Sequence, residues 1–179
     1  MQDLDSQIEW FKNKYMRSRN EAFKSRWLKL AGDRLKWLSN KKIGLLKQIN
    51  TRLKEERVLT FCNNIEQTEV IGNCINSKNK QSLITLEAFN NGEINHISAV
   101  NMLNEGCNLI NCRVGIFGNL NSSEIIVIQR LGRLLRHKSP IIIIPYYKNT
   151  REEEIVVKMI ENYNKDLIQV IKSVNDIKI

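Results

Sequence analysis

The chain has 179 residues, of which 42% are hydrophobic, so it can form a packed core and is not a disordered chain. Its length fits one ordinary domain with an extension. The 28 Lys and Arg residues exceed the 19 Asp and Glu residues, and the resulting formal charge of +9 favours a polyanionic partner. No apolar run is long enough to cross a bilayer, and the first residues are polar and acidic. We therefore expect no membrane association and a cytoplasmic location.

The four cysteines do not form a metal-binding pattern. No C-x-x-C pair occurs, and only two histidines, His96 and His137, are available as further ligands. We predict no metal site and assign neither histidine a catalytic role. Two of the cysteines, Cys62 and Cys112, lie in apolar runs, where reduced and buried thiols are expected.

The first 54 residues are predicted to be helical. They are rich in Lys, Arg, Trp and Leu, and their apolar residues recur at helical spacing, with a break at Ser39 and Asn40. This pattern predicts two or three amphipathic helices with a solvated basic face. The tryptophans could stack on bases or pack between helices, and helical spacing favours packing; they are Trp10, Trp27 and Trp37.

After residue 57, short β-rich runs alternate with helical stretches. Strands are predicted at 57–62, 94–102, 112–117 and 140–146. Helices are predicted at 66–74, at 122–137 and at 150–163, and a further helix is predicted to end at Phe89. This alternation predicts an α/β fold with a parallel sheet that is covered on both faces.

One predicted helix has a distinctive polar face. Gln129, Arg133 and Arg136 recur at i, i+4 and i+7, so they share one side, and Gly132 lies beside them. Two guanidinium groups and an amide next to a residue without Cβ suit a phosphate chain. The alternative interpretation is an ordinary solvated basic face.

Residues 129–136, QRLGRLLR, resemble motif VI (Q-R-x-G-R-x-x-R) of the superfamily-two helicases and translocases. The form of this motif is similar to that of the branch containing excision-repair translocases and restriction-enzyme motor subunits. Other segments resemble elements of the same family in its order: a linker at 34–42, motif IV at 58–64, a lead-in at 89–94, motif V at 101–109 and a Thr-Glu element at 149–153. The resemblance covers about residues 30–165.

The resemblance implies the second of two RecA-like domains, with the P-loop NTPase-like, helicase C-terminal fold. We expect this domain at 55–179, after a helical extension or linker at 1–54 that comes from the first motor domain. In this family ATP binds between the two domains, and the first domain supplies the phosphate loop and the acidic Mg²⁺ box. Neither motif occurs in this sequence. We therefore expect ATP to be shared with an absent first domain that holds Mg²⁺, and no hydrolysis by this chain alone.

The resemblance also implies roles for nine residues. In the catalytic group, Arg133 and Arg136 would be arginine fingers, and Gln129 would hydrogen-bond near the nucleotide. The implied nucleotide-binding residues are Gly106, Asn108 and Gly132. Many relatives have Asp at the position of Asn108, so its ribose contact lacks the charge. The implied nucleic-acid-binding residues are Asn63, Asn64 and Asn104, although an ordinary turn or cap role is an equal alternative for each.

The sequence thus predicts the C-terminal motor domain of an ATP-dependent helicase or translocase. Its partners would be nucleic acid, with DNA favoured over RNA, and the first RecA-like domain. The alternative is a non-catalytic module that binds nucleic acid or a protein partner and has kept the fold. A stand-alone nucleotide-binding domain is a third possibility, which the missing phosphate loop disfavours.

Overall fold

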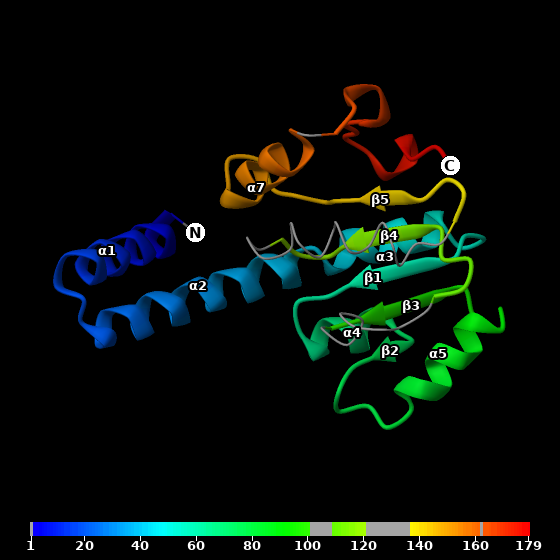
Figure 1. Cartoon of the computed structure of the whole chain (residues 1–179), viewed down its shortest axis with the longest axis horizontal. Helices are drawn as coiled ribbons and strands as arrows, with labels where there is room; N and C mark the ends of the chain where they lie inside the picture. Colours follow the sequence, from blue (N-terminus) through cyan, green and yellow to red (C-terminus); the bar gives the residue numbers. More distant parts are fainter. Residues whose placement is uncertain (1, 101–108, 121–136, 162) are drawn as a thin grey trace. The chain divides into compact units, whose positions relative to one another are not determined.

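The computed structural model describes residues 2–100, 109–120, 137–161 and 163–179 (Figure 1). The chain divides into two compact units, Met1–Lys41 and Lys42–Ile179. The first contains two helices and the second contains a sheet with its covering helices. Within the described residues, no helix has the length and apolar character needed to cross a membrane.

The first unit is a hairpin of α1 (Gln2–Ser18) and α2 (Glu21–Lys41). Acidic residues lie in the first turn of each helix and a basic residue in the last, which suits the helix dipole. The chain reverses at Arg19, whose φ is 54°, and the side chain of Asn20 accepts a hydrogen bond from the N–H of Ala22 at 2.9 Å. These local interactions end α1 and begin α2.

Aromatic contacts and one ion pair join the two helices. The rings of Phe11 and Phe23 lie 6.3 Å apart, and those of Tyr15 and Trp27 lie 6.2 Å apart. Near the start of α1, Asp5 accepts a hydrogen bond from Arg34 at 2.6 Å. Trp27 is half-buried against Tyr15, as the packing interpretation predicted, whereas Trp10 contacts two rings but is 51% exposed and Trp37 is 47% exposed.

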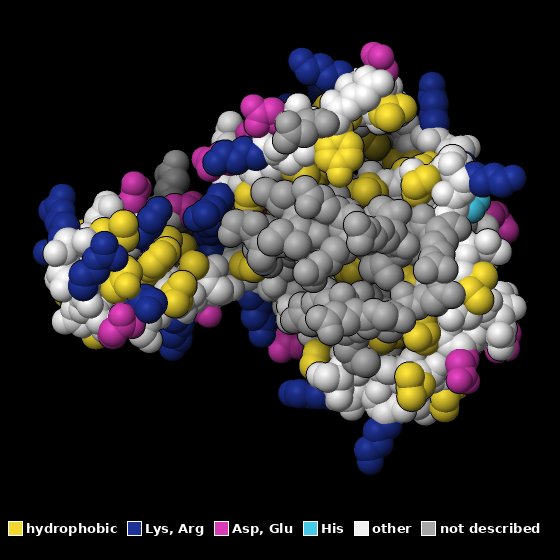
Figure 2. All heavy atoms as spheres, in the orientation of Figure 1, with side chains coloured by type: hydrophobic (Ala, Val, Ile, Leu, Met, Phe, Trp, Pro, Cys, Tyr) yellow, Lys and Arg dark blue, Asp and Glu magenta, His cyan; other side chains and the backbone are white. Residues whose placement is uncertain are grey.

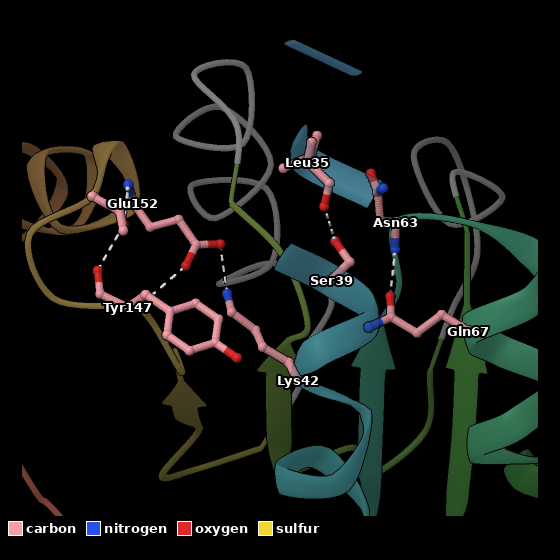
Figure 3. Close-up of polar contacts among 8 residues, drawn as sticks. Leu35, Ser39, Lys42, Asn63, Gln67, Tyr147 and Glu152 are labelled. Atoms are coloured by element: carbon pink, nitrogen blue, oxygen red, sulfur yellow. Dashed lines mark hydrogen bonds and ion pairs between the residues drawn. The ribbon is translucent and has the colours of Figure 1, made fainter. Parts of the chain in front are cut away.

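The predicted break at Ser39 and Asn40 is wrong, because α2 continues to Lys41. The Ser39 hydroxyl donates a hydrogen bond to the carbonyl of Leu35 at 2.8 Å (Figure 3). A serine that bonds to the carbonyl four residues earlier is accommodated within a helix. The interruption comes at Lys42, and α3 (Ile43–Arg52) follows directly.

The second unit is built on a five-stranded parallel sheet with the order β2-β3-β1-β4-β5 (Figure 1). The central strand β1 pairs with β3 on one side and β4 on the other, so that Val58 lies opposite both His96 and Val114. The strands are β1 (Val58–Phe61), β2 (Cys74–Ile75), β3 (His96–Ala99), β4 (Val114–Phe117) and β5 (Ile141–Ile143).

Helices cover both faces of this sheet, as predicted from the sequence. Besides α3, the helices among the described residues are α4 (Ile65–Ile71), α5 (Ser82–Asn90), α7 (Arg151–Ile160) and two short 3₁₀ helices, η1 (Lys165–Leu167) and η2 (Val174–Asp176). Side chains of α3 and Ile177 pack with Val58 and Ile116 in one buried cluster. Side chains of α5 and α7 pack with Leu59 and Ile97 in the other. The alternation of neighbouring residues between two cores is typical of a parallel sheet buried on both faces.

The sequence located most elements but misplaced one. The predicted helix at 66–74 ends at Ile71, and Cys74 belongs to β2 instead. The backbone leaves the helix at Gly72 and Asn73, whose φ values are 105° and 45°. A two-residue strand leaves no periodic signal, and β2 exists because it pairs with β3. The predicted helix at 122–137 lies almost wholly outside the described residues.

Two cysteines are core residues, as expected. Cys62 and Cys112 are buried free thiols, and burial raises the pKa of each to about 12. His96 has a structural contact, since its Nε2 lies 2.9 Å from the carbonyl oxygen of Leu53. This contact joins the end of α3 to the beginning of β3.

Candidate functional site

The parallel strands end at one common edge of the sheet, which we call the carboxyl edge. Past β1 the chain crosses to β2 and β3 on one side, whereas β4 lies on the other side of β1. Ligands of open α/β sheets bind at the carboxyl ends of strands where the connections diverge in this way. The segments there are 62–64 after β1 and 118–120 after β4. This edge is therefore the candidate site.

The segment after β1 is fixed by reciprocal hydrogen bonds to α4. The N–H of Asn63 donates to Oε1 of Gln67 at 2.9 Å (Figure 3). Oδ1 of Asn64 accepts from the N–H of Gln67 at 2.8 Å, so Asn64 is the N-cap of α4. Gln67 itself is fully buried. Asn64 therefore has the cap role, which was one of the two roles that the sequence left open for it.

The cap uses only half of the Asn64 side chain. Its Nδ2 is buried and has no hydrogen-bond partner among the described residues. A buried amide donor without a partner costs about 1–3 kcal/mol. The amide could donate to an anionic oxygen while Oδ1 continues to cap α4. The capping and binding interpretations of Asn64 are thus compatible.

Gly118 permits the close approach of the β1 and β4 ends. Its N–H donates to the carbonyl of Phe61 at 2.7 Å. A Cβ on this residue would lie 2.6 Å from the same oxygen and 3.1 Å from Cδ1 of Leu46. Next to this contact, the rings of Phe61 and Phe117 stack with their centroids 5.2 Å apart. The ends of β1 and β4 are therefore tightly packed against each other at the carboxyl edge.

A buried ion pair lies beyond the ends of the strands (Figure 3). Nζ of Lys42 donates to Oε1 of Glu152 at 2.6 Å, and the two side chains are only 2% and 3% exposed. The other carboxylate oxygen of Glu152 accepts from the N–H of Tyr147 at 3.1 Å. Burial raises the pKa of Tyr147 above its ordinary value, and the charge of Glu152 adds to this. The pair joins the residue before α3 to the first turn of α7.

Both members of this pair belong to segments that the resemblance identified. Lys42 ends the linker at 34–42, and Glu152 lies in the Thr-Glu element at 149–153. Sequence reasoning gave neither residue a role, although each is a charged residue at a fixed position of its motif. The two motifs carry opposite charges, but the sequence does not show which of the four cations at 34–42 meets which of the two carboxylates at 149–153.

Seven of the nine predicted site residues lie outside the described residues: Gly106, Asn108, Asn104, Gln129, Gly132, Arg133 and Arg136. Their two segments follow described residues at the carboxyl edge. Val100 comes directly after β3, and Leu120 comes three residues after the end of β4. Asn63 and Asn64 lie at this same edge, so the chain leads from it into both of the other motif segments.

The family of helicase conserved C-terminal domains matches residues 41–138, which is more than half of the chain. The chain therefore belongs to this family. With its parallel sheet and preceding helices, it has the RecA-like fold of a helicase C-terminal domain.

Two solved structures are similar to this chain. The E. coli DEAD-box protein SrmB, bound to regulator of ribonuclease activity A, matches with 16% identity and a TM-score of 0.54 over 67% of this chain and 79% of that chain. The Pyrococcus furiosus Hef helicase domain matches with 20% identity and a TM-score of 0.49 over 87% of this chain and 37% of that chain. The similarity to SrmB supports the fold. No curated protein matches this chain.

Substitution of Gly118 by Ala should destabilise the second unit. The new methyl group would clash with the carbonyl of Phe61, and this backbone atom cannot move without disturbing β1. We expect a loss of about 1–3 kcal/mol in the free energy of unfolding, measured by urea denaturation. Gly32→Ala is the matched control, because a Cβ there meets nothing within 4 Å. Equal stability of the two variants would contradict the close approach.

Removal of one member of the buried ion pair should be more damaging than removal of both charges. Lys42→Met leaves the Glu152 carboxylate buried without its cation, and we expect a loss of about 3–5 kcal/mol. Adding Glu152→Gln should recover most of this, because Gln is neutral and can still accept from the N–H of Tyr147. Urea denaturation of the single and double variants measures the difference.

The exposed pair of Lys54 and Glu55, whose side chains are 75% and 83% exposed, supplies the control. Lys54→Met should leave the unfolding midpoint unchanged, since solvent screens such pairs. If Lys42→Met behaved like this control, the buried pair would not stabilise the carboxyl edge.

Proposed function

We propose that this chain is the second motor domain of an ATP-dependent nucleic-acid helicase or translocase. The observation that supports it is topological: β1, β3 and β4 end at one edge, from which the chain enters the three motif segments. The first RecA-like domain would supply the phosphate loop and the acidic box, which this sequence lacks. Residues 1–54 would then be the helical linker from that domain, and 55–179 the second domain.

We assign the contacts with the nucleotide to the segments that follow β3 and β4. Arg133 and Arg136 would stabilise the charge that spreads over the γ-phosphate oxygens, and Gln129 would hydrogen-bond near it. Mg²⁺, held by the first domain, would neutralise charge on the β- and γ-phosphate oxygens. Because the arginines would reach ATP only when the domains close, hydrolysis would be coupled to closure. The proposed nucleotide-binding residues are Gly106, Asn108 and Gly132.

We assign the contacts with nucleic acid to small polar side chains. Asn63, Asn64 and Asn104 would hydrogen-bond to the sugar-phosphate backbone, which positions a strand without reading its sequence. The position of Asn63 and Asn64 directly after β1, at the carboxyl edge, supports this role. We propose DNA as the track, because the motif VI segment resembles that of repair translocases and restriction motor subunits.

The second candidate is a non-catalytic module that binds nucleic acid or a protein partner. The formal charge of +9 suits such a module as well as a motor domain. The two candidates differ in whether the arginines of motif VI are needed for turnover.

Arginine substitutions test the motor role directly. In the protein that joins this domain to its first RecA-like domain, Arg133→Ala or Arg136→Ala should reduce ATP turnover by about 10³-fold or more. Steady-state phosphate release measures this, and circular dichroism checks the fold. Arg52→Ala is the control, because Arg52 is an exposed arginine at the end of α3. Undiminished turnover in the motif VI variants would reject the arginine-finger role and favour the non-catalytic module.

Asn64→Asp separates the cap from the proposed contact with the strand. The aspartate keeps an oxygen that caps α4, so the free energy of unfolding should be unchanged, but it replaces the amide donor with an anion. We expect the affinity for single-stranded DNA to fall at least about 10-fold, measured by fluorescence anisotropy. Asn91→Asp makes the same charge change at an exposed residue after α5. Equal loss in both variants would show that only net charge matters.

A further inference from the structure

Three aromatic rings of the first unit each have a cation over them. In each case the cation follows the ring by four residues: Lys14 Nζ lies 5.3 Å from the centroid of Trp10, Arg19 Cζ 5.8 Å from Tyr15, and Lys41 Nζ 5.6 Å from Trp37. Lys24 lies 5.6 Å from the same tyrosine ring. Cations at this distance are attracted to the face of the ring. The hairpin therefore presents repeated pairs of a ring and a positive charge.

Two of these rings are largely exposed. Trp10 is 51% and Trp37 is 47% exposed to solvent. The edge-on contacts of Trp10 with Phe11 and Phe23 hold its ring in place. In Figure 2, hydrophobic and basic side chains lie side by side on the hairpin. A fixed and exposed indole next to a cation is suited to bind a flat, negatively charged ligand.

Trp37 continues the face of α2 that packs on α1. It follows the buried Leu30 by seven residues and Arg34, which pairs with Asp5, by three. Residues at these spacings share one side of a helix. Within the described residues, Trp37 has no aromatic neighbour and its one ring contact is the Lys41 cation. This part of the face is therefore open to a ligand.

The charge of the unit indicates which ligand this is. Residues 1–41 contain ten Lys and Arg and five Asp and Glu. Exposed rings with a surplus of cations fit a polyanion that also offers flat apolar surfaces, which describes unpaired nucleobases on a phosphate chain. A duplex is a poorer fit, because its bases are already stacked on one another. Trp27 is less suited to stacking, since it is half-buried against Tyr15.

We propose that the α1–α2 hairpin is a second nucleic-acid contact, where unpaired bases stack on Trp37 and Trp10 and phosphates pair with Lys41 and Lys14. The proposal rests on the proposed function for the nature of the polyanion. It adds a surface that lies outside the sheet and its carboxyl edge. The alternative occupants, a protein partner or a second copy of this chain, would not depend on unpaired bases.

The test measures binding of the whole chain to a fluorescein-labelled single strand of about 20 nucleotides, as DNA and as RNA, and to the matching duplex. Trp37→Ala should weaken single-strand binding about 5- to 100-fold, as expected for the loss of one base stack. Trp37→Phe keeps a ring and should retain most of the affinity. Lys41→Gln should lower the slope of log affinity against log salt by about 0.7.

Leu28→Ala is the matched control, because Leu28 is 53% exposed and lies nine residues before Trp37, on the opposite side of α2. It should not change the affinity. Thermal melting of each variant establishes that the helices still form, and Trp37→Phe covers the case in which the alanine variant unfolds.

The outcomes separate this proposal from the proposed function. If Trp37→Ala matches Leu28→Ala while Asn64→Asp still weakens binding, the hairpin contact is wrong and the role of the carboxyl edge stands. If the duplex binds as tightly as the single strand and Trp37→Ala has no effect, charge alone acts and the hairpin proposal is again overturned. If no nucleic acid binds to the chain, both proposals fail. A selective loss with Trp37→Ala, restored by Trp37→Phe, supports the hairpin contact.

Discussion

Parallel pairing of the five strands is the constraint on which the rest of this structure depends. Because both faces of the sheet are buried under helices, only the ends of the strands can present polar groups. Parallel strands place all their carboxyl ends at one edge, so residues far apart in the sequence meet there without any local signal. Asn64 and Gly118 lie 54 positions apart (118 − 64), yet both follow strands that pair in register through Phe61 and Phe117.

The ion pair of Lys42 and Glu152 connects two segments that lie beyond the carboxyl edge of the sheet. Its two residues are 110 positions apart, and both side chains are almost fully buried. A buried pair of charges gives little net stability over an apolar pair, but the loss of one partner is costly. Its main effect is therefore on geometry: it holds Lys42, the residue before α3, against the first turn of α7. Lys42 is also the last residue of the linker motif at 34–42.

The sequence predicted those features that depend on neighbouring residues. The apolar runs gave β1, β3, β4 and β5, and helical periodicity gave α1 to α3, because these patterns reflect burial along one element. The sequence did not predict β2, which depends on pairing with β3, or the continuation of α2 past Ser39, whose hydroxyl bonds to a carbonyl of the same helix. It placed Asn63 and Asn64 after β1, but the unused donor of Asn64 follows from three-dimensional packing. The ion pair was missed for the same reason, since it joins two distant motifs.

The two surfaces proposed to contact nucleic acid use different chemistry, and this difference has a physical consequence. At the carboxyl edge, an amide such as that of Asn64 would contact the phosphate backbone, which is the same for every sequence. On the hairpin, Trp37 would stack on base faces, which every base also offers. Neither surface distinguishes one base from another, and a protein that moves along a strand needs this tolerance at every step. Stacking requires unpaired bases, however, whereas backbone contacts do not. The hairpin would therefore give the protein a preference for single strands, which the backbone contacts at the carboxyl edge do not provide.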